Sequence, residues 1–139
     1  MKPRVLFLCT GNSARSQMAE GWLRHLAGDR YDVFSAGTKP VGLNPGAVDA
    51  MAEVGVDIAH HRSKSATEFT AMPFDYVITV CNRAKESCPR WSGAVRLIHW
   101  SFDDPAAVTE SAEQRRQVFR RVRDEIAASI REFLASVTA

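Results

Sequence analysis

A cysteine and an arginine lie six residues apart near the start of the sequence, with a short polar segment between them. Cys9 is followed by Thr10-Gly11-Asn12-Ser13-Ala14 and then by Arg15 and Ser16. Such a loop points successive backbone N–H groups into one concavity, which binds a tetrahedral anion and favours the thiolate form of a cysteine. Arg15 adds a planar guanidinium that can hold two oxygens of the anion. The pattern therefore predicts a nucleophilic Cys9 in an oxyanion-binding loop formed by residues 10–16.

The segments on either side of this loop predict the strand and the helix that would position it. Residues 4–9 form an apolar run that is typical of a strand buried on both faces. Apolar residues then recur at intervals of three and four from Met18 to Leu26, and Gly28 follows where a helix would end. The alternative is a core cysteine and a surface arginine beside an ordinary turn, but a strand, a tight loop and a helix start favour an anion site. Ser13 and Ser16 could both donate hydrogen bonds to the sulfur.

The remaining pattern predicts an α/β fold with a parallel sheet. Strands are expected at 31–35, 76–80 and 95–100, and helices at 45–54, 66–71 (capped by Ser65) and 111–136. Strands that alternate with helices imply four parallel strands with helices on both faces. Ligands of such sheets bind at the carboxyl ends of the strands, which is where Cys9 is expected. The length of 139 residues indicates one domain, 1–139.

Composition argues against several classes of partner. The 18 basic and 16 acidic residues leave a net charge of +2, and the arginines at 115, 116, 120, 121 and 123 are expected on a solvated helix face. We therefore expect no binding to nucleic acid. No apolar run approaches a membrane span, and five apolar residues after the N-terminus are too few for a signal peptide. The protein is expected in the cytoplasm, without membrane attachment.

Two further cysteines indicate redox chemistry. Cys81 follows the third expected strand at the same edge of the sheet as Cys9, and Cys88 comes seven residues later. Three cysteines do not form a disulfide framework in a reducing compartment. If the intervening segment is helical, the two Cα atoms lie about 10 Å apart, whereas a disulfide needs about 4.4 to 6.8 Å. A disulfide between them would require that segment to unwind; the alternative is two structural cysteines at a strand end.

The sequence resembles the low-molecular-weight protein tyrosine phosphatase fold family. The likeness rests on Cys-x5-Arg-Ser after the first strand, on Ser35-Ala36-Gly37-Thr38 and on Asp104-Pro105. It implies that Cys9 is the nucleophile, Arg15 the oxyanion clamp and Asp104 the general acid. A carboxyl that delivers a proton would also assist departure of an oxygen leaving group. Asp103 is the neighbouring candidate, but only Asp104 precedes the proline.

Within that fold, the chain is most similar to the thioredoxin-coupled arsenate reductases. The similarity includes Cys81, Cys88-Pro89 and the segment from His99-Trp100 to Asp104-Pro105-Ala106. It implies that Cys9 attacks arsenate, that Cys81 and then Cys88 resolve the adduct, and that thioredoxin reduces the final disulfide. No bound cofactor is expected. Phosphate and sulfate are expected to compete with arsenate.

Some members of that family hold a potassium ion beside the loop. The ligands correspond to Asn12, Glu20 and Ser35 and to an acidic residue at the position of Lys64. We hypothesise that the ammonium group of Lys64 replaces the cation, although Lys64 could equally be a solvated surface residue. No other metal site is expected. His60 and His61 are adjacent, so their side chains should diverge and belong to the surface.

Two other functions remain compatible with the sequence. A protein tyrosine phosphatase would need Cys9 but neither Cys81 nor Cys88. A thiol-based redox or arsenite sensor would bind its ligand without turnover, although it would have little use for Arg15. The physiological reductant also stays open between thioredoxin and a mycothiol or glutaredoxin route, and a monomer is expected.

Overall fold

The computed structural model describes residues 2–82, 91 and 93–138, and its centre is a parallel sheet. The strands are β1 (Arg4–Cys9), β2 (Asp32–Gly37), β3 (Phe74–Thr79) and β4 (Ala94–His99). They lie in the order β2-β1-β3-β4, and all neighbouring pairs are parallel. The predicted four-stranded parallel sheet is confirmed: β1 has its expected bounds, and the ends of the other three strands are shifted by one or two residues.

The described residues also form three α-helices and two short 3-10 helices. The α-helices are α1 (Arg15–Ala27), α2 (Pro45–Ala52) and α3 (Ala112–Thr138). The 3-10 helices are η1 (Ala66–Phe69) and η2 (Pro105–Ala107). The expected helix at 66–71 is thus a single 3-10 turn, although Ser65 caps it as predicted by accepting a hydrogen bond from the Thr67 N–H.

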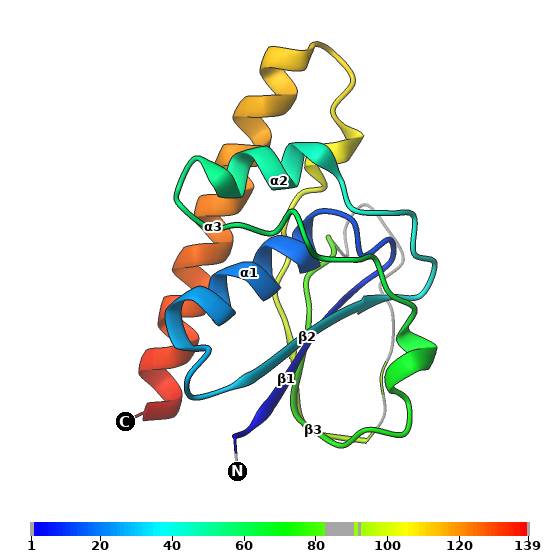
Figure 1. Cartoon of the computed structure of the whole chain (residues 1–139), viewed down its shortest axis with the longest axis vertical. Coiled ribbons are helices and arrows are strands. Elements are labelled where there is room, and N and C mark those ends of the chain that lie inside the picture. Colours follow the sequence, from blue (N-terminus) through cyan, green and yellow to red (C-terminus); the bar gives the residue numbers. More distant parts are fainter. Residues whose placement is uncertain (1, 83–90, 92, 139) are drawn as a thin grey trace.

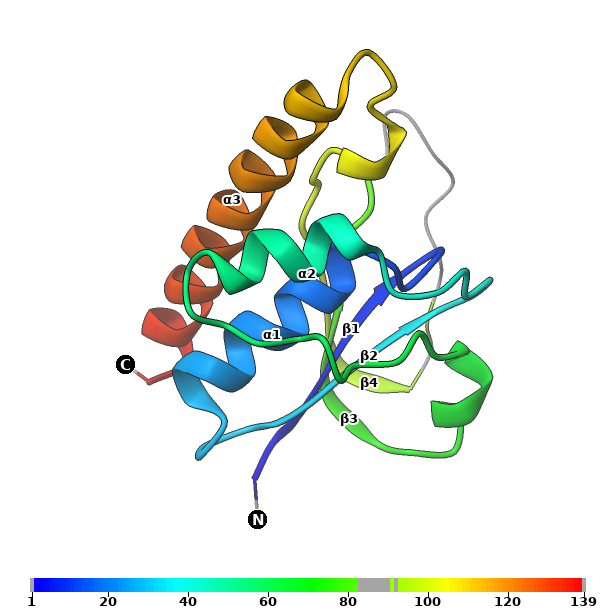
Figure 2. The ribbon, with the colours of Figure 1, turned by 45° about the horizontal axis from the view of Figure 1, so that its top comes forward.

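Alternate residues of the buried strands face two separate cores. Val5 and Phe7 point toward a large core shared with α1, α2 and α3. Leu6 and Leu8 point to the opposite face, where Phe69 at the end of η1 helps to cover them. Figures 1 and 2 show the three α-helices gathered on one side of the sheet and η1 on the other. The helical cover is therefore present on both faces but is much heavier on one.

The arginines near the start of α3 do not all lie on a solvated face, as the sequence had suggested. Arg123 is buried, where its guanidinium donates to the carbonyl of Ala50 and to the carboxylate of Glu53, both at 2.9 Å. Arg120 binds the same carboxylate from a more exposed position. These contacts attach α3 to the end of α2, so part of the arginine cluster serves helix packing.

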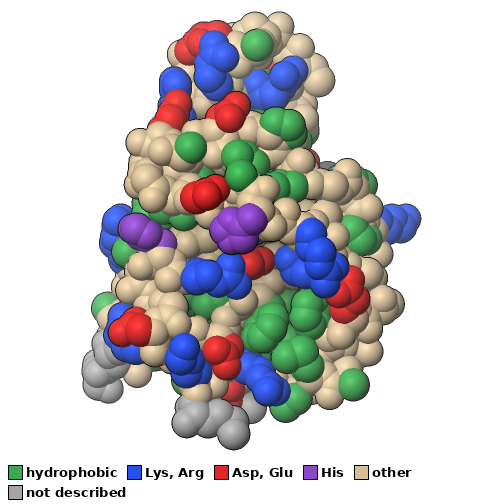
Figure 3. All heavy atoms as spheres, in the orientation of Figure 1, with side chains coloured by type: hydrophobic (Ala, Val, Ile, Leu, Met, Phe, Trp, Pro, Cys, Tyr) green, Lys and Arg blue, Asp and Glu red, His purple; other side chains and the backbone are tan. Residues whose placement is uncertain are grey.

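The surface carries both positively and negatively charged side chains. Basic and acidic side chains are interspersed on the face seen in Figure 3, which agrees with the small net charge. Among the described residues, no helix is both long and apolar enough to cross a membrane.

Candidate active site

The loop that follows β1 lies where the order of the strands reverses. From β1 the chain moves to β2 on one side, and then crosses to β3 on the other side of β1. A reversal of this kind leaves a crevice at the carboxyl ends of the two central strands. Cys9 is the last residue of β1, and Cys81 follows two residues after β3. The fold thus brings both cysteines to one edge of the sheet, as predicted.

The Cys9 sulfur is buried and receives hydrogen bonds from the loop. The backbone N–H of Asn12 donates to it at 3.1 Å, and the Ser16 hydroxyl lies 2.8 Å away. Helix α1 starts after Ala14 without a side-chain cap. Its positive N-terminal end therefore faces the loop, which favours the binding of an anion there. Of the two serines expected to contact the sulfur, Ser16 does so, whereas Ser13 lines the cavity above it.

Asn12 gives the loop its shape. Its φ is +46°, in the left-handed region that few residues other than glycine adopt, and its side chain is fully buried. The amide nitrogen donates to the hydroxyls of Ser16 (2.8 Å) and Ser35 (3.0 Å). The amide oxygen accepts from the Lys64 N–H (2.8 Å) and from the Gln17 amide (3.0 Å). These four bonds hold the strained conformation that directs the Asn12 N–H at the sulfur.

Gln17 and His61 support this loop, and the sequence indicated neither of them. Gln17 is fully buried, and its amide nitrogen also donates to the carbonyls of Asn12 (3.1 Å) and Arg62 (2.9 Å). Its amide oxygen lies 3.0 Å from Nδ1 of His61. The His61 side chain is only 4% exposed, so its expected place on the surface was wrong. Burial lowers the pKa of His61, although the charge of Glu20 acts in the opposite direction, and the lowered pKa favours the neutral ring. The one signal in the sequence was that Gln17, a polar residue, falls on the side of α1 that is buried.

A small cavity opens above Cys9. Its volume is about 110 Å³, and its lining includes Cys9, Gly11, Ser13 and Ala14 of the loop together with Arg15, Val41, Asp104 and Ala106. The guanidinium of Arg15 donates to the carbonyl of Phe102 at 3.2 Å, which fixes its direction. A free thiol, a guanidinium group and a carboxyl group therefore surround one space.

Asp104 and Asp103 make different contacts. The Asp104 carboxylate lies 3.9 Å from Arg15 on the cavity wall, and it caps η2 by accepting from the Ala106 N–H. Asp103 instead contacts Asn82 (2.8 Å) and Arg121 (3.0 Å). Only Asp104 is therefore placed to act on a group bound at Cys9, which agrees with the preference drawn from Pro105.

The ammonium group of Lys64 lies among the residues that were expected as ligands of a cation. Its ammonium group lies 3.5 Å from the Glu20 carboxylate, 3.4 Å from the Ser35 hydroxyl and 2.9 Å from the Arg62 carbonyl. Ser35 also donates to Glu20. Burial would raise the pKa of Glu20, but Lys64 and its other partners lower it below its ordinary value. The residues do not fit a potassium ion, because an ammonium group already sits among its expected ligands.

The two cysteines within the described residues differ in their bonding. Cys9 has a free thiol, whereas Cys81 is buried and disulfide-bonded. Cys88 lies outside the described residues. The main-chain bond from the Val80 N–H to the Leu8 carbonyl (3.1 Å) keeps the chain beside β1 as it approaches Cys81.

Known proteins share both the sequence and the fold of this chain. The model of the family described as low molecular weight phosphotyrosine protein phosphatase matches residues 4–139. An arsenate reductase of Halalkalibacterium halodurans is 46% identical over 132 residues, which are 95% of each chain. A solved arsenate reductase in its phosphate-binding state matches 98% of each chain, with a TM-score of 0.82 and 33% identity. The solved thioredoxin-dependent arsenate reductase of Corynebacterium glutamicum has a TM-score of 0.74 and 30% identity, over 99% of this chain and 62% of that one. With its loop after β1 and a match that spans nearly all its residues, the chain belongs to the low molecular weight phosphotyrosine protein phosphatase family.

Proposed function

We propose that this protein reduces arsenate to arsenite through a relay of Cys9, Cys81 and Cys88. The observation that carries the proposal is the cavity of about 110 Å³ that surrounds a free Cys9 thiol with Arg15 and Asp104, at the sheet edge where Cys81 also lies. Its relatives named arsenate reductase, at 46% identity over nearly the whole chain, support the choice of substrate.

The first step forms a bond between sulfur and arsenic. The Cys9 thiolate attacks arsenate held by the loop N–H groups and by Arg15, and an oxygen leaves as water with a proton from Asp104. The Asn12 N–H and the Ser16 hydroxyl hold the thiolate before the attack. The fixed charge of Arg15 stabilises the negative charge of the transition state.

The second and third steps transfer two electrons. The Cys81 thiolate attacks the Cys9 sulfur, and the sulfur–arsenic bond breaks with its electron pair on arsenic. Arsenite departs, and a disulfide between Cys9 and Cys81 remains. Cys88 then attacks Cys81 and frees the Cys9 thiolate. A free Cys9 beside a disulfide-bonded Cys81 is the state expected after this step. An external dithiol completes the cycle, so no bound cofactor is required.

Thioredoxin is the reductant that we propose, because a protein dithiol must reach the disulfide from outside. The thioredoxin-dependent relative from Corynebacterium glutamicum supports this assignment. The relay needs a compartment in which thiols are kept reduced, which favours the cytoplasm. Phosphate and sulfate compete for the same loop, since they share the charge and shape of arsenate. The cycle needs one copy of the chain, so we propose that a monomer is active.

Phosphatase activity is the second candidate function, because the family and the loop serve phosphate esters equally well. Arsenic(V) accepts electrons from thiols and phosphorus(V) does not under these conditions, so the two activities differ in their need for Cys81 and Cys88. A phosphatase would retain its turnover when either cysteine is replaced by serine.

A coupled assay with NADPH, thioredoxin reductase, thioredoxin and arsenate separates these functions. We expect steady NADPH oxidation by the wild type, at most one turnover by Cys81→Ser and Cys88→Ser, and none by Cys9→Ser. Aryl phosphate hydrolysis by the same four proteins is the matched control. Hydrolysis that needs only Cys9, without any arsenate-dependent NADPH oxidation by the wild type, would contradict the proposed reductase activity and show that the protein is a phosphatase.

A further inference from the structure

A hydrogen bond joins the residue that follows Cys81 to the segment between β4 and η2. The side-chain amide of Asn82 donates to the carboxylate of Asp103 at 2.8 Å, across 21 positions of the sequence. Both residues are partly buried. The steps proposed for the reduction of arsenate use neither of these side chains. The contact thus lies beside the cysteine relay without taking part in its chemistry.

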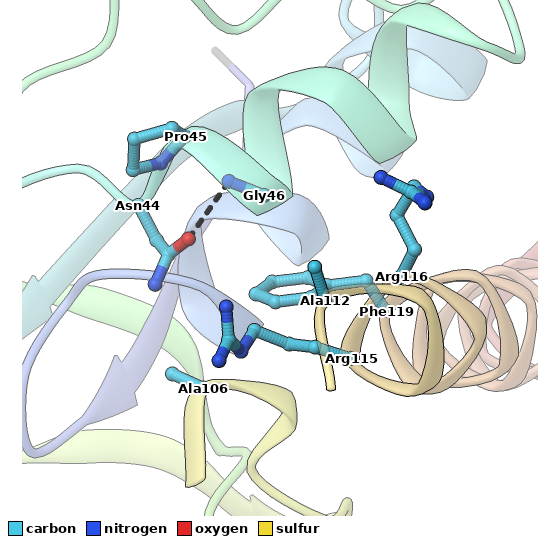
Figure 4. Close-up of a pocket in the computed structure, with 8 residues that line it drawn as sticks. All are labelled: Asn44, Pro45, Gly46, Ala106, Ala112, Arg115, Arg116 and Phe119. Atoms are coloured by element: carbon cyan, nitrogen blue, oxygen red, sulfur yellow. Dashed lines mark hydrogen bonds between the residues drawn. The ribbon is translucent and has the colours of Figure 1, made fainter. Parts of the chain in front are cut away.

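The carboxylate of Asp103 is held in place from α3. Its other oxygen accepts from the guanidinium of Arg121 at 3.0 Å, and Arg121 also pairs with Glu125 one turn further along the helix. On the other side of η2, the Nε of Arg115 donates to the carbonyl of Val108 at 2.9 Å, and Figure 4 shows this side chain reaching from α3 toward η2. Two arginines of α3 thus attach the chain before and after η2, which fixes the Asp103 carboxylate relative to that helix.

The position of Asn82 depends instead on the bonding of Cys81, which is disulfide-bonded in this structure. A disulfide with Cys88 brings the two Cα atoms to about 4.4 to 6.8 Å, whereas a helical course over the same residues would place them about 10 Å apart. The chain before Cys81 is held to the sheet by the bond from the Val80 N–H to the Leu8 carbonyl. Any change of path between the oxidised and the reduced protein therefore begins at Asn82.

We propose that Asp103 is a positioning residue that binds Asn82 in the oxidised protein and releases it in the reduced protein, and so stabilises the disulfide of Cys81. This inference rests on the disulfide between Cys81 and Cys88 in the proposed function, but on neither the oxyanion nor the identity of the reductant. Reduction of the disulfide takes two electrons and two protons from an external dithiol, which itself becomes a disulfide. A hydrogen bond that exists only before this step favours the oxidised side of the equilibrium. A charge-assisted bond at a partly exposed position favours it by about tenfold.

Redox titration measures this contribution without arsenate and without turnover. The full chain is equilibrated with mixtures of reduced and oxidised dithiothreitol at neutral pH, and alkylation followed by intact mass spectrometry counts three free thiols in the reduced protein and one in the oxidised protein. Asn82→Ala removes the bond and should raise the equilibrium constant for reduction about tenfold, which raises the midpoint potential by about 30 mV. Asn82→Asp places a second carboxylate against Asp103 and should raise the midpoint further. Gln114→Glu adds the same charge to the exposed first turn of α3 and should leave the midpoint unchanged.

An exchange of the two side-chain types distinguishes this role from general damage to the fold. When Asn82→Asp is combined with Asp103→Asn, the amide at position 103 can donate to the carboxylate at position 82 while its oxygen still accepts from Arg121. The midpoint should then return toward the wild-type value. Asp103→Asn alone leaves two amides that can still bond each other, so it should shift the midpoint less than Asn82→Asp does.

The outcomes separate the inference from the function on which it rests. Equal midpoints in the wild type and Asn82→Asp, or no recovery in the exchanged variant, would overturn the inference and leave the relay intact. A wild type that keeps three free thiols in oxidising buffer would overturn the disulfide between Cys81 and Cys88, and the inference with it.

Discussion

Replacement of Lys64 by methionine would test whether a buried ammonium group supports the catalytic loop. The side chains of Lys64 and Glu20 are 12% and 7% exposed, and their charged atoms lie 3.5 Å apart. Removal of one partner of a buried ion pair costs about 3 to 5 kcal/mol, because the other charge stays buried. Glu20 would keep Arg24 at 2.7 Å and the Ser35 hydroxyl. We therefore expect Lys64→Met to lose about 3 kcal/mol of unfolding free energy, the lower end of that range.

The same substitution should reduce catalysis through Asn12. Methionine keeps the volume of the side chain and the backbone N–H that binds Asn12, so the variant removes mainly the charge. Ser35, which holds the Asn12 amide, loses its contact with the ammonium group. Loss of the exact orientation of the Asn12 N–H toward Cys9 should lower kcat/KM for arsenate by about tenfold. The variant opens a space among the expected cation ligands, so potassium chloride should restore part of the loss, and sodium chloride less.

Urea denaturation and the coupled arsenate assay, each in potassium or sodium chloride, measure these effects. Lys39→Met removes an exposed lysine and is the matched control, which should behave as the wild type in both salts. A strong stimulation of the wild type by potassium over sodium would contradict the replacement of the cation by Lys64. A loss of less than about 1 kcal/mol in Lys64→Met would show that the pair is no more than a surface contact.

Two further substitutions address the general acid and the attachment of α3. Asp104→Asn should lower kcat by about 100-fold through loss of proton transfer, whereas Asp103→Asn should change kcat less than about threefold, and steady-state rates on arsenate compare them. The hydrogen bond from Arg120, with a further one from Arg123, lowers the pKa of Glu53 to about 2. The pKa of Glu53 is thus lower in the folded than in the unfolded protein. Glu53 therefore stabilises the fold fully at pH values above its ordinary pKa, and this stabilisation is lost as the pH falls toward 2. The Tm difference between wild type and Glu53→Gln, followed by circular dichroism, should be largest near pH 7, small at pH 2 and absent below it.

The features that the sequence predicted correctly are those that depend on residues close to one another in the sequence. The apolar run at 4–9, the turn residues after it and the periodicity from Met18 determine a strand, a loop and a helix in immediate succession. Because such a unit places its loop at the carboxyl edge of a parallel sheet, the place of Cys9 and Arg15 followed without knowledge of the packing. Asp104 required more, since it approaches Arg15 from 89 positions later in the sequence, and only Pro105 distinguished it from Asp103.

The residues that the sequence did not reveal depend on which segments pack together. His61 belongs to a polar stretch that resembles a surface loop, yet this stretch lies over the start of α1 and buries the histidine against Gln17 and Glu20. Arg123 likewise continues a run of exposed arginines and is buried only because α2 ends beside it. Buried polar side chains need partners, and those partners are 41 to 73 positions away. A single sequence contains no local signal for such pairs.

The loop at Cys9 joins these two kinds of information. Its backbone path is predictable, but its reactivity depends on an asparagine held at a φ of +46° by side chains from α1 and β2 and by the backbone N–H of Lys64. A left-handed conformation of this kind costs about 1 kcal/mol or more, and it persists only where the surroundings impose it. Loss of any one of the four bonds to Asn12 should therefore weaken the hold on the Cys9 sulfur before it weakens the fold. The supporting residues, rather than the loop sequence alone, are what separate a reactive Cys-x5-Arg loop from a chance pairing of the two residues.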